Sequence, residues 1–179
     1  MRELYRLLED LTVLHRAPAA YRRLLALGFA AVPIARHGLQ HQNAAVRRYC
    51  CAFLDHFLVP EALPDLLGML HDPDPVVRST TLHTLACDRC KEGACRPQEA
   101  EVLPAALRVL GDDADAHVRA MAIEVVGQYV HTNPVAQQAL LEAAGNDASP
   151  TVRKKARWYA PGGPIFRRTA PRAPRKSRT

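Results

Sequence analysis

The sequence contains no alternating runs of Val, Thr and Ile, the pattern that predicts β-strands. Aromatic residues are scarce at 6% of the 179 residues, whereas apolar residues reach 48% and consist mainly of Ala and Leu. Ala and Leu have high helix propensity, and their side chains allow helices to pack closely. The composition therefore gives no support to a sheet, favours an all-α fold and supplies enough apolar side chains for a packed core.

A long apolar segment is missing as well. The run at residues 24–35 has 12 residues, whereas a membrane-spanning helix needs about 20. Arg22 and Arg23 precede this run like a twin-arginine signal, but no small-residue cleavage site follows it. We therefore predict no membrane association and a soluble, cytoplasmic protein with reduced thiols.

Motifs of the common enzyme classes are not found either. The chain has no P-loop, no G-x-G-x-x-G, no G-x-S-x-G and no H-E-x-x-H. No small-molecule substrate is evident from the sequence. Most histidines are scattered over predicted turns and helix surfaces, namely His15, His37, His41, His56, His71, His117 and His131. We predict that the protein is not an enzyme.

The positive net charge is confined to the C-terminus. The formal net charge is +6, and of the 24 Lys and Arg residues six lie in residues 167–179, which leaves 18 basic and 18 acidic residues for the rest of the chain. The body of the protein is therefore neutral. The segment 164–179 follows a Pro-Gly-Gly sequence and ends in prolines and cations, so we predict a disordered basic tail.

A short charged pattern recurs along the chain. An Asp stands six residues before the Arg of a Val-Arg pair in three places, Asp72/Arg78, Asp113/Arg119 and Asp147/Arg153. A fourth pair, Val46-Arg47, has His41 at the Asp position. Successive valines of these pairs are 31, 41 and 34 residues apart. Such a period predicts stacked helical repeats, each of which buries its apolar face against its neighbours.

The pattern predicts that each repeat is a pair of helices. Pro33, Pro64 and Pro104 lie 13 or 14 residues before their valines and suit the first turn of a first helix. A turn rich in Asp, Pro, Gly and Ser follows, and the second helix is predicted to start at the Val-Arg pair. Its buried stripe has small side chains four residues after each valine, namely Cys50, Thr81, Ala122 and Ala156.

These features resemble HEAT repeats, including the short bacterial HEAT-like class, over about residues 30–160 and more weakly over 2–15 and 18–28. The resemblance implies a right-handed α-solenoid of four to five stacked antiparallel helix pairs. We expect this solenoid to occupy residues 1–163, with N-terminal capping helices in residues 1–29.

In HEAT repeats, the recurring Asp and Arg form a ladder between adjacent repeats, and the resemblance implies this role for the six residues of the pattern. An Asp in the turn can cap the second helix, and the planar Arg side chain can bind a neighbouring carboxylate with two hydrogen bonds. The alternative is that the arginines line a phosphate-binding surface. His41 interrupts the ladder, which predicts that the first repeat stacks differently.

The longest interval between valines contains an insertion, residues 87–97, with three of the five cysteines. Cys87, Cys90 and Cys95 follow a C-x2-C-x4-C spacing, and His83 stands one helical turn before Cys87. One His and three Cys residues form an established tetrahedral zinc set. We therefore predict a structural zinc site that consists of these four residues.

The sequence also allows other roles for the cysteines. Cys87 and Cys90 could form a redox pair or handle metal ions, although Cys87 lies late in its helix rather than at a helix N-terminus. The cysteines could also simply pack in a loop. An iron–sulfur cluster would need Cys50 or Cys51 as a fourth thiolate, and Cys50 is more simply a core residue.

The end of the chain suggests binding to polyanions. Basic arms add sequence-independent affinity for nucleic acids, and the alternative is a solubilising terminus with no partner. Trp158 is predicted to seal the open end of the solenoid rather than to stack on a ligand. The basic residues concerned are Arg153, Lys154, Lys155, Arg157, Arg167, Arg168, Arg172, Arg175, Lys176 and Arg178.

The function that these observations favour is a non-catalytic scaffold for protein–protein interaction, with zinc bound in the insertion. The first alternative is a nucleic-acid-associated protein that binds phosphates through the last repeat and the basic tail. The second alternative is a thiol redox or metal-handling protein that acts through Cys87 and Cys90.

Overall fold

The computed structural model describes residues 2–87, 95 and 97–171 of the chain. Its α-helices follow one another with short turns and three short 3-10 segments, at residues 28–31, 60–62 and 69–71. None of the described helices is long and apolar enough to cross a membrane. The helices are α1 (Arg2–Leu11), α2 (Ala17–Leu27), α3 (Val32–Gly38), α4 (Ala44–Phe57), α5 (Leu63–Gly68), α6 (Pro75–Ala86), α7 (Glu99–Asp112), α8 (Ala116–Gln128), α9 (Pro134–Asn146), α10 (Pro150–Tyr159) and α11 (Pro164–Thr169).

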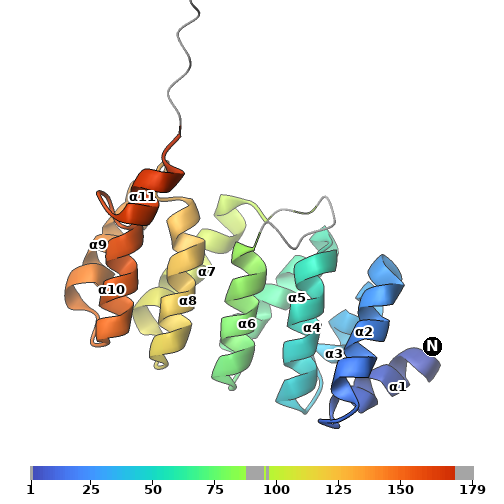
Figure 1. Ribbon diagram of the computed structural model, residues 1–179. Coiled ribbons are helices and arrows are strands. Elements are labelled where there is room, and N and C mark those ends of the chain that lie inside the picture. Colours follow the sequence, from blue (N-terminus) through green and yellow to red (C-terminus); the bar gives the residue numbers. More distant parts are fainter. Residues whose placement is uncertain (1, 88–94, 96, 172–179) are drawn as a thin grey trace, which may run out of the picture.

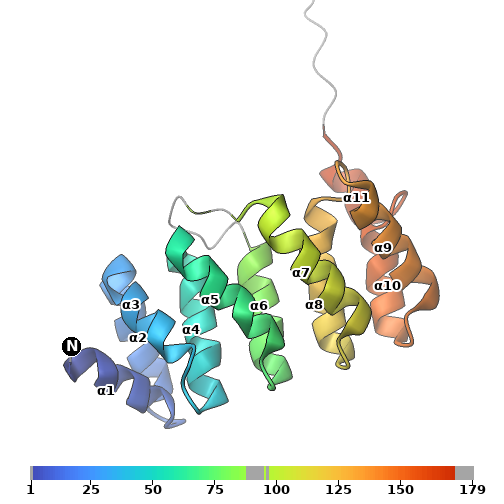
Figure 2. The ribbon, with the colours of Figure 1, turned by 180° about the vertical axis from the view of Figure 1, so that it is seen from behind.

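The helices form an all-α solenoid of stacked pairs, as the sequence predicted. In Figure 1, α2, α4, α6, α8 and α10 form the layer nearer the viewer. Figure 2 shows the other layer, formed by α1, α3, α5, α7 and α9. The second helices α4, α6, α8 and α10 run in the same direction, so their N-terminal turns lie at one edge and their C-terminal ends at the opposite edge (Figure 1).

Two predicted helix boundaries differ from the structure. The second helices start two residues before their valines, because the turn residue that caps each helix precedes the Val-Arg pair. Pro104 lies inside α7 rather than in its first turn. Helix α7 begins earlier because Gln98 and Glu101 form a capping box, which satisfies backbone N–H groups at the helix start.

The core contains the residues that recur along the second helices. Val46, Val77, Val118 and Val152 are completely buried, as are the small residues four positions later in each helix, Cys50, Thr81, Ala122 and Ala156. Small side chains at these positions allow adjacent second helices to approach closely. Gly127 extends this pattern, because a Cβ atom there would lie 2.2 Å from the ring of Tyr159 on α10.

The ladder aspartates fix the turn before each second helix without capping the helix themselves. Asp72 Oδ1 accepts a hydrogen bond from the Asp74 N–H at 2.9 Å. Asp74 is the residue that caps α6, because its side chain accepts from the N–H groups of Val76 and Val77. The prediction that the ladder Asp caps the helix was therefore wrong by two residues. The same division of roles recurs with Asp113 and Asp115 before α8.

The arginines connect each repeat to the next one. Arg47 donates to both carboxylate oxygens of Asp72, at 2.6 and 2.8 Å. Arg78 binds Asp113 at 2.7 and 2.8 Å, and Arg119 binds Asp147 at 2.8 and 2.9 Å. The carboxylate of each pair is at least nine-tenths buried. Charge-assisted bidentate pairs of this kind are among the stronger polar contacts in proteins.

The spacing of six residues between Asp and Arg also has a structural reason within one repeat. Each arginine uses its remaining Nη1 group to bind two carbonyls of the turn that precedes its own helix. Arg78 Nη1, for example, lies 2.8 Å from the Asp72 carbonyl and 3.3 Å from the Pro73 carbonyl. Arg47, Arg119 and Arg153 make the equivalent pairs of contacts. One arginine therefore secures its own turn and the turn of the next repeat.

The first repeat joins the ladder although it lacks the Asp. Arg47 reaches Asp72 and binds the backbone carbonyl of His41, which any residue could supply. The His41 ring replaces the other role of the Asp, because its Nδ1 accepts the Asn43 N–H at 3.0 Å. The expectation that this repeat stacks differently was therefore wrong with respect to its contact with the next repeat.

Hydrogen bonding keeps the ladder carboxylates charged. Burial alone raises the pKa of Asp72 and Asp113, but hydrogen bonds from Arg47 and Arg78 and from turn N–H groups outweigh burial and lower both pKa values. The hydrogen bond from Arg119 is the main reason that the pKa of Asp147 is lowered.

The C-terminal end of the solenoid differs from the prediction. Residues 164–169, expected to be disordered, form α11, while residues 172–179 lie outside the described part of the chain. Trp158 does not seal the end, because 41% of its surface is exposed and Lys154 lies over its ring. Phe166 of α11 packs against the core and against His131 instead.

Substitution of a ladder arginine should destabilise the protein more when the arginine binds a buried carboxylate of the next repeat than when it does not. We expect Arg78→Met to lower the free energy of unfolding by roughly 3 kcal/mol, because Asp113 would stay buried without its counter-charge. Arg153 makes the same contacts with its own turn but has no such carboxylate among the described residues. Arg153→Met should therefore cost only about 1 kcal/mol. Urea unfolding measures both values. An equal decrease in the free energy of unfolding for the two variants would contradict the view that the Arg–Asp pairs are the main connection between repeats.

Acid should weaken the ladder. Because the pKa values of Asp72, Asp113 and Asp147 are lowered in the folded state, their contribution is complete above the unfolded pKa of about 3.9 and is lost as the pH falls below it. Urea unfolding between pH 7 and pH 2 should show this decline. Asp113→Asn should reduce its slope by up to about 1.4 kcal/mol per pH unit, whereas Asp112→Asn, an exposed control, should leave the slope unchanged.

Candidate functional site

Two of the predicted metal ligands lie at the C-terminal end of α6. His83 lies on the surface of this helix, and Cys87 is the residue that follows its last turn. Cys95 is half-buried and packs against the core, whereas Cys90 lies outside the described residues. Of the four predicted ligands, the structure thus brings His83 and Cys87 together.

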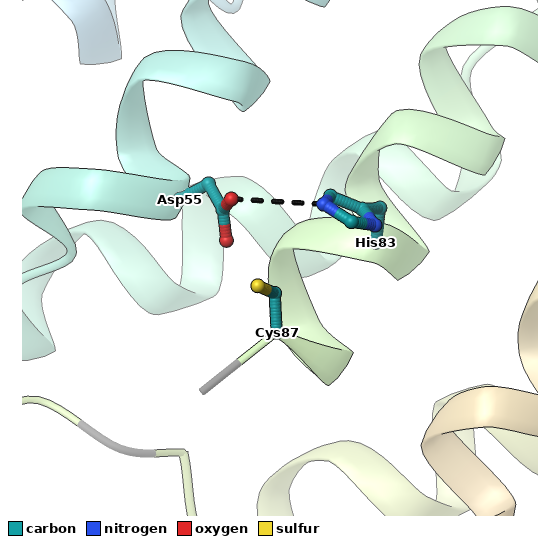
Figure 3. A group of neighbouring side chains, drawn as sticks. All are labelled: Asp55, His83 and Cys87. Carbon is teal, nitrogen blue, oxygen red and sulfur yellow. Dashed lines mark ion pairs between the residues drawn. The ribbon is translucent and has the colours of Figure 1, made fainter. Parts of the chain in front are cut away.

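A third residue, Asp55 of α4, joins these two. Ligand atoms of Asp55, His83 and Cys87 all lie within 4.8 Å of one another, and Asp55 Oδ2 lies 3.7 Å from His83 Nε2. Figure 3 shows the three side chains converging from the two adjacent second helices. Cys95 is not a member of this group. Oxygen, nitrogen and sulfur donors at such distances could hold a metal ion.

Asp55 is an unusual residue for the interior. Only 4% of its surface is exposed, and its Oδ1 has no hydrogen-bond partner among the described residues. Its charge also affects Tyr21 on α2: burial, and next the charge of Asp55, raise the pKa of Tyr21 to about 12. A buried carboxylate with an unsatisfied oxygen is costly and calls for an explanation.

The sequence prediction missed Asp55 because it searched for ligands close to the cysteines. Asp55 lies 28 residues before His83, and only the stacking of α4 on α6 brings the two together. A signal was nevertheless present. Asp55 stands nine residues after Val46, and the equivalent positions in the next two repeats are Ala86 and Gly127. A lone carboxylate at a position otherwise filled by small residues is a departure from the repeat pattern.

The cysteines of α4 belong to the core rather than to a metal cluster. Cys50 and Cys51 are completely buried. Burial raises the pKa of Cys50 strongly and that of Cys51 to about 12, so both remain thiols. The Cys51 sulfur accepts a hydrogen bond from Thr81 on α6 at 3.4 Å. Their environment agrees with the core role predicted for Cys50.

A cavity of about 750 Å³ adjoins the metal-ligand group. It lies where the C-terminal ends of α6, α8 and α10 meet α11. Its wall combines aromatic, polar and charged side chains, which can contact both apolar and polar parts of a ligand. His83 and Cys87 belong to the lining, together with Glu124, Gln128, Tyr129, His131, Tyr159 and Arg168.

The basic residues of the last repeat are only partly available to a polyanion. Lys155 forms an ion pair with Glu124 at 2.6 Å, and Arg153 binds two turn carbonyls. Lys154, Arg157, Arg167 and Arg168 are exposed. Arg172, Arg175, Lys176 and Arg178 lie outside the described residues. Among the described basic residues of this region, Arg153 and Lys155 are therefore engaged within the protein, and the other four are exposed.

Comparison with known proteins relates this architecture to a repeat family. The family model of HEAT repeats matches residues 32–89 and 90–160. A search of curated proteins found no match. Among solved structures, the complex of CpcE and CpcF of phycocyanin lyase from Nostoc sp. PCC7120 contains a similar chain, with a TM-score of 0.68 and 22% identity over 86% of this chain and 95% of that one.

A designed armadillo repeat protein in complex with the peptide (KR)4 is also similar, with a TM-score of 0.54 and 18% identity over 88% of this chain and 80% of that one. At these identities, both similarities concern the fold.

Proposed function

The chain belongs to the HEAT repeat family, and we propose that it is a non-catalytic scaffold that binds a protein partner in the cavity between α6, α8, α10 and α11. The observation that carries this proposal is the cavity itself, about 750 Å³ in volume and lined by Tyr129, Tyr159 and Arg168. Tyr and Arg are enriched among residues that dominate the energy of protein interfaces.

The rest of the molecule is suited to hold such a surface in place. The Arg–Asp pairs fix each second helix relative to the next one, so the residues of the cavity wall are presented from a rigid framework. Preorganisation of this kind lowers the entropy cost of binding. Both similar structures were determined with a protein or peptide partner, which supports the same class of role here.

The second part of the proposal concerns metal. We propose that the group at the end of α6 binds zinc and that His83 and Cys87 are two of its ligands. The sequence offers Cys90 and Cys95 as candidates for the remaining positions of a tetrahedral site. Zinc at this position would fix the insertion that follows α6, beside the cavity.

The interface can be tested with paired substitutions that differ only in their location. Gln128→Arg and Arg168→Glu change exposed residues of the cavity wall. Gln138→Arg on α9 and Arg108→Glu on α7 are the same changes at exposed sites in the other helical layer. Proteins crosslinked to the wild-type chain in its native cells should be recovered with the α7 and α9 variants. Their recovery should fall at least about ten-fold with the cavity variants, and equal recovery from all four variants would contradict the proposed interface.

Elemental analysis of the untagged protein tests the metal separately. We expect one equivalent of zinc per chain in the wild type and loss of zinc in His83→Ala and Cys87→Ser, because each change removes a ligand. Cys51→Ser is the control, since Cys51 lies in the core. Metal-free protein that does not take up added zinc would contradict this part and leave the scaffold proposal untouched.

A further inference from the structure

Asp55 is a buried carboxylate that the described protein does not neutralise fully. Its side chain is 6% exposed, and its nearest cationic candidate is His83 Nε2, 3.7 Å from Oδ2. This distance exceeds that of a hydrogen bond. The other oxygen, Oδ1, has no hydrogen-bond partner in the described part of the chain. A protonated His83 would therefore leave half of the carboxylate unsatisfied, which is costly in the interior.

The ligand atoms of Asp55 and His83 are nearly as far apart as two ligands of a tetrahedral metal site. Zinc lies about 2.0 to 2.3 Å from O, N and S ligands, so two ligands of a tetrahedral site are about 3.3 to 3.8 Å apart. The separation of 3.7 Å between Asp55 and His83 is close to this value. The ligand atoms of all three residues lie within 4.8 Å of one another, and 53% of the His83 side chain is exposed, so His83 can change its rotamer without disturbing the core.

The group connects two helices, because Asp55 belongs to α4, whereas His83 lies on α6 and Cys87 directly follows α6 (Figure 3). At the N-terminal ends of these two helices, Arg47 and Asp72 form a buried pair. At their C-terminal ends, the described residues form no Arg–carboxylate pair between the two helices, and Asp55 and His83 are 3.7 Å apart. A cation shared by Asp55, His83 and Cys87 would supply the missing connection.

The residue at the repeat position of His83 in the next second helix forms an ordinary ion pair. Glu124 occupies the position of His83 in the next repeat and binds Lys155 at 2.6 Å. There, a lysine ammonium neutralises the carboxylate, whereas Asp55 faces an imidazole and a thiol. Imidazole and thiolate are typical ligands of borderline transition metals.

We propose that Asp55, His83 and Cys87 bind one divalent metal ion of the zinc type and that this ion clamps the second helices of two adjacent repeats together. The inference rests on the metal part of the proposed function and adds Asp55 to His83 and Cys87 as a third ligand. Asp55 takes one position of the tetrahedral site, so at most two sulfur ligands remain. The site becomes a connection between repeats rather than a local feature of the insertion. His83 and Cys87 also line the cavity, so the ion lies at the wall of the proposed interface.

Metal titration of the chelator-treated full-length protein tests the role of Asp55. Cobalt(II) is the probe, because its absorption reports tetrahedral coordination and thiolate ligation. We expect Asp55→Asn to bind cobalt and zinc at least about ten-fold more weakly than the wild type. Asp112→Asn, an exposed control on α7, should bind like the wild type. Unchanged affinity in Asp55→Asn would overturn the inference.

Thermal unfolding compares the stability of Asp55→Asn and the wild type in the metal-free and zinc-bound states, and the expected differences have opposite signs. Without metal, Asp55→Asn should have an unfolding temperature equal to or higher than that of the wild type, because a buried unsatisfied charge is removed. With zinc, the wild type should gain stability and the variant should gain little. A variant that is less stable than the wild type without metal would show that Asp55 serves only as an ion-pair partner of His83.

X-ray absorption at the zinc edge of the wild-type protein gives an answer that does not depend on folding of a variant. One or two sulfur ligands, together with oxygen and nitrogen ligands, are expected. Three sulfurs and one nitrogen would overturn the role of Asp55 and support the set of His83 and three cysteines. No zinc binding at all would remove both sets, and the cavity variants would still test the scaffold independently.

Discussion

The bidentate pairing of an arginine in one repeat with a buried aspartate in the next is the interaction on which the rest of the structure depends. Arg47, Arg78 and Arg119 each bind a carboxylate of the following repeat and two carbonyls of their own turn. The geometry leaves little freedom in the angle between successive second helices. A solenoid has few contacts between distant repeats, so its shape is the accumulated result of these local connections.

The two edges of the second-helix layer are organised differently. The N-terminal edge repeats one contact, with the His41 ring taking over the turn contact of the missing Asp. The C-terminal edge varies from repeat to repeat: Asp55, His83 and Cys87 meet between α4 and α6, whereas Glu124 and Lys155 pair between α8 and α10. The cavity also lies at this second edge. The contacts that recur in every repeat thus maintain the framework, and the contacts that differ between repeats are available for function.

Much of the fold followed from the sequence because its determinants are local and periodic. The Asp and Arg positions, the valines and the small residues after them recur once per repeat, and each places its neighbours by helix geometry alone. The predicted helix boundaries were wrong where a second local signal for the start of a helix was present. Pro104 was placed at a helix start because proline is common there, but the capping box at Gln98 and Glu101 starts α7 earlier.

The sequence by itself determined that the chain is a stack of helix pairs, which residues face the core and that an insertion with cysteines follows α6. Only the tertiary structure decided which residues accompany His83 and Cys87. Asp55 lies far from them along the chain, and its role depends on the angle and offset at which α4 packs on α6. Likewise, Phe166 rather than Trp158 packs at the end of the solenoid, because the direction in which α11 folds back onto the last repeat depends on packing. Periodicity fixes which face of a helix is buried, but not which distant side chains meet there.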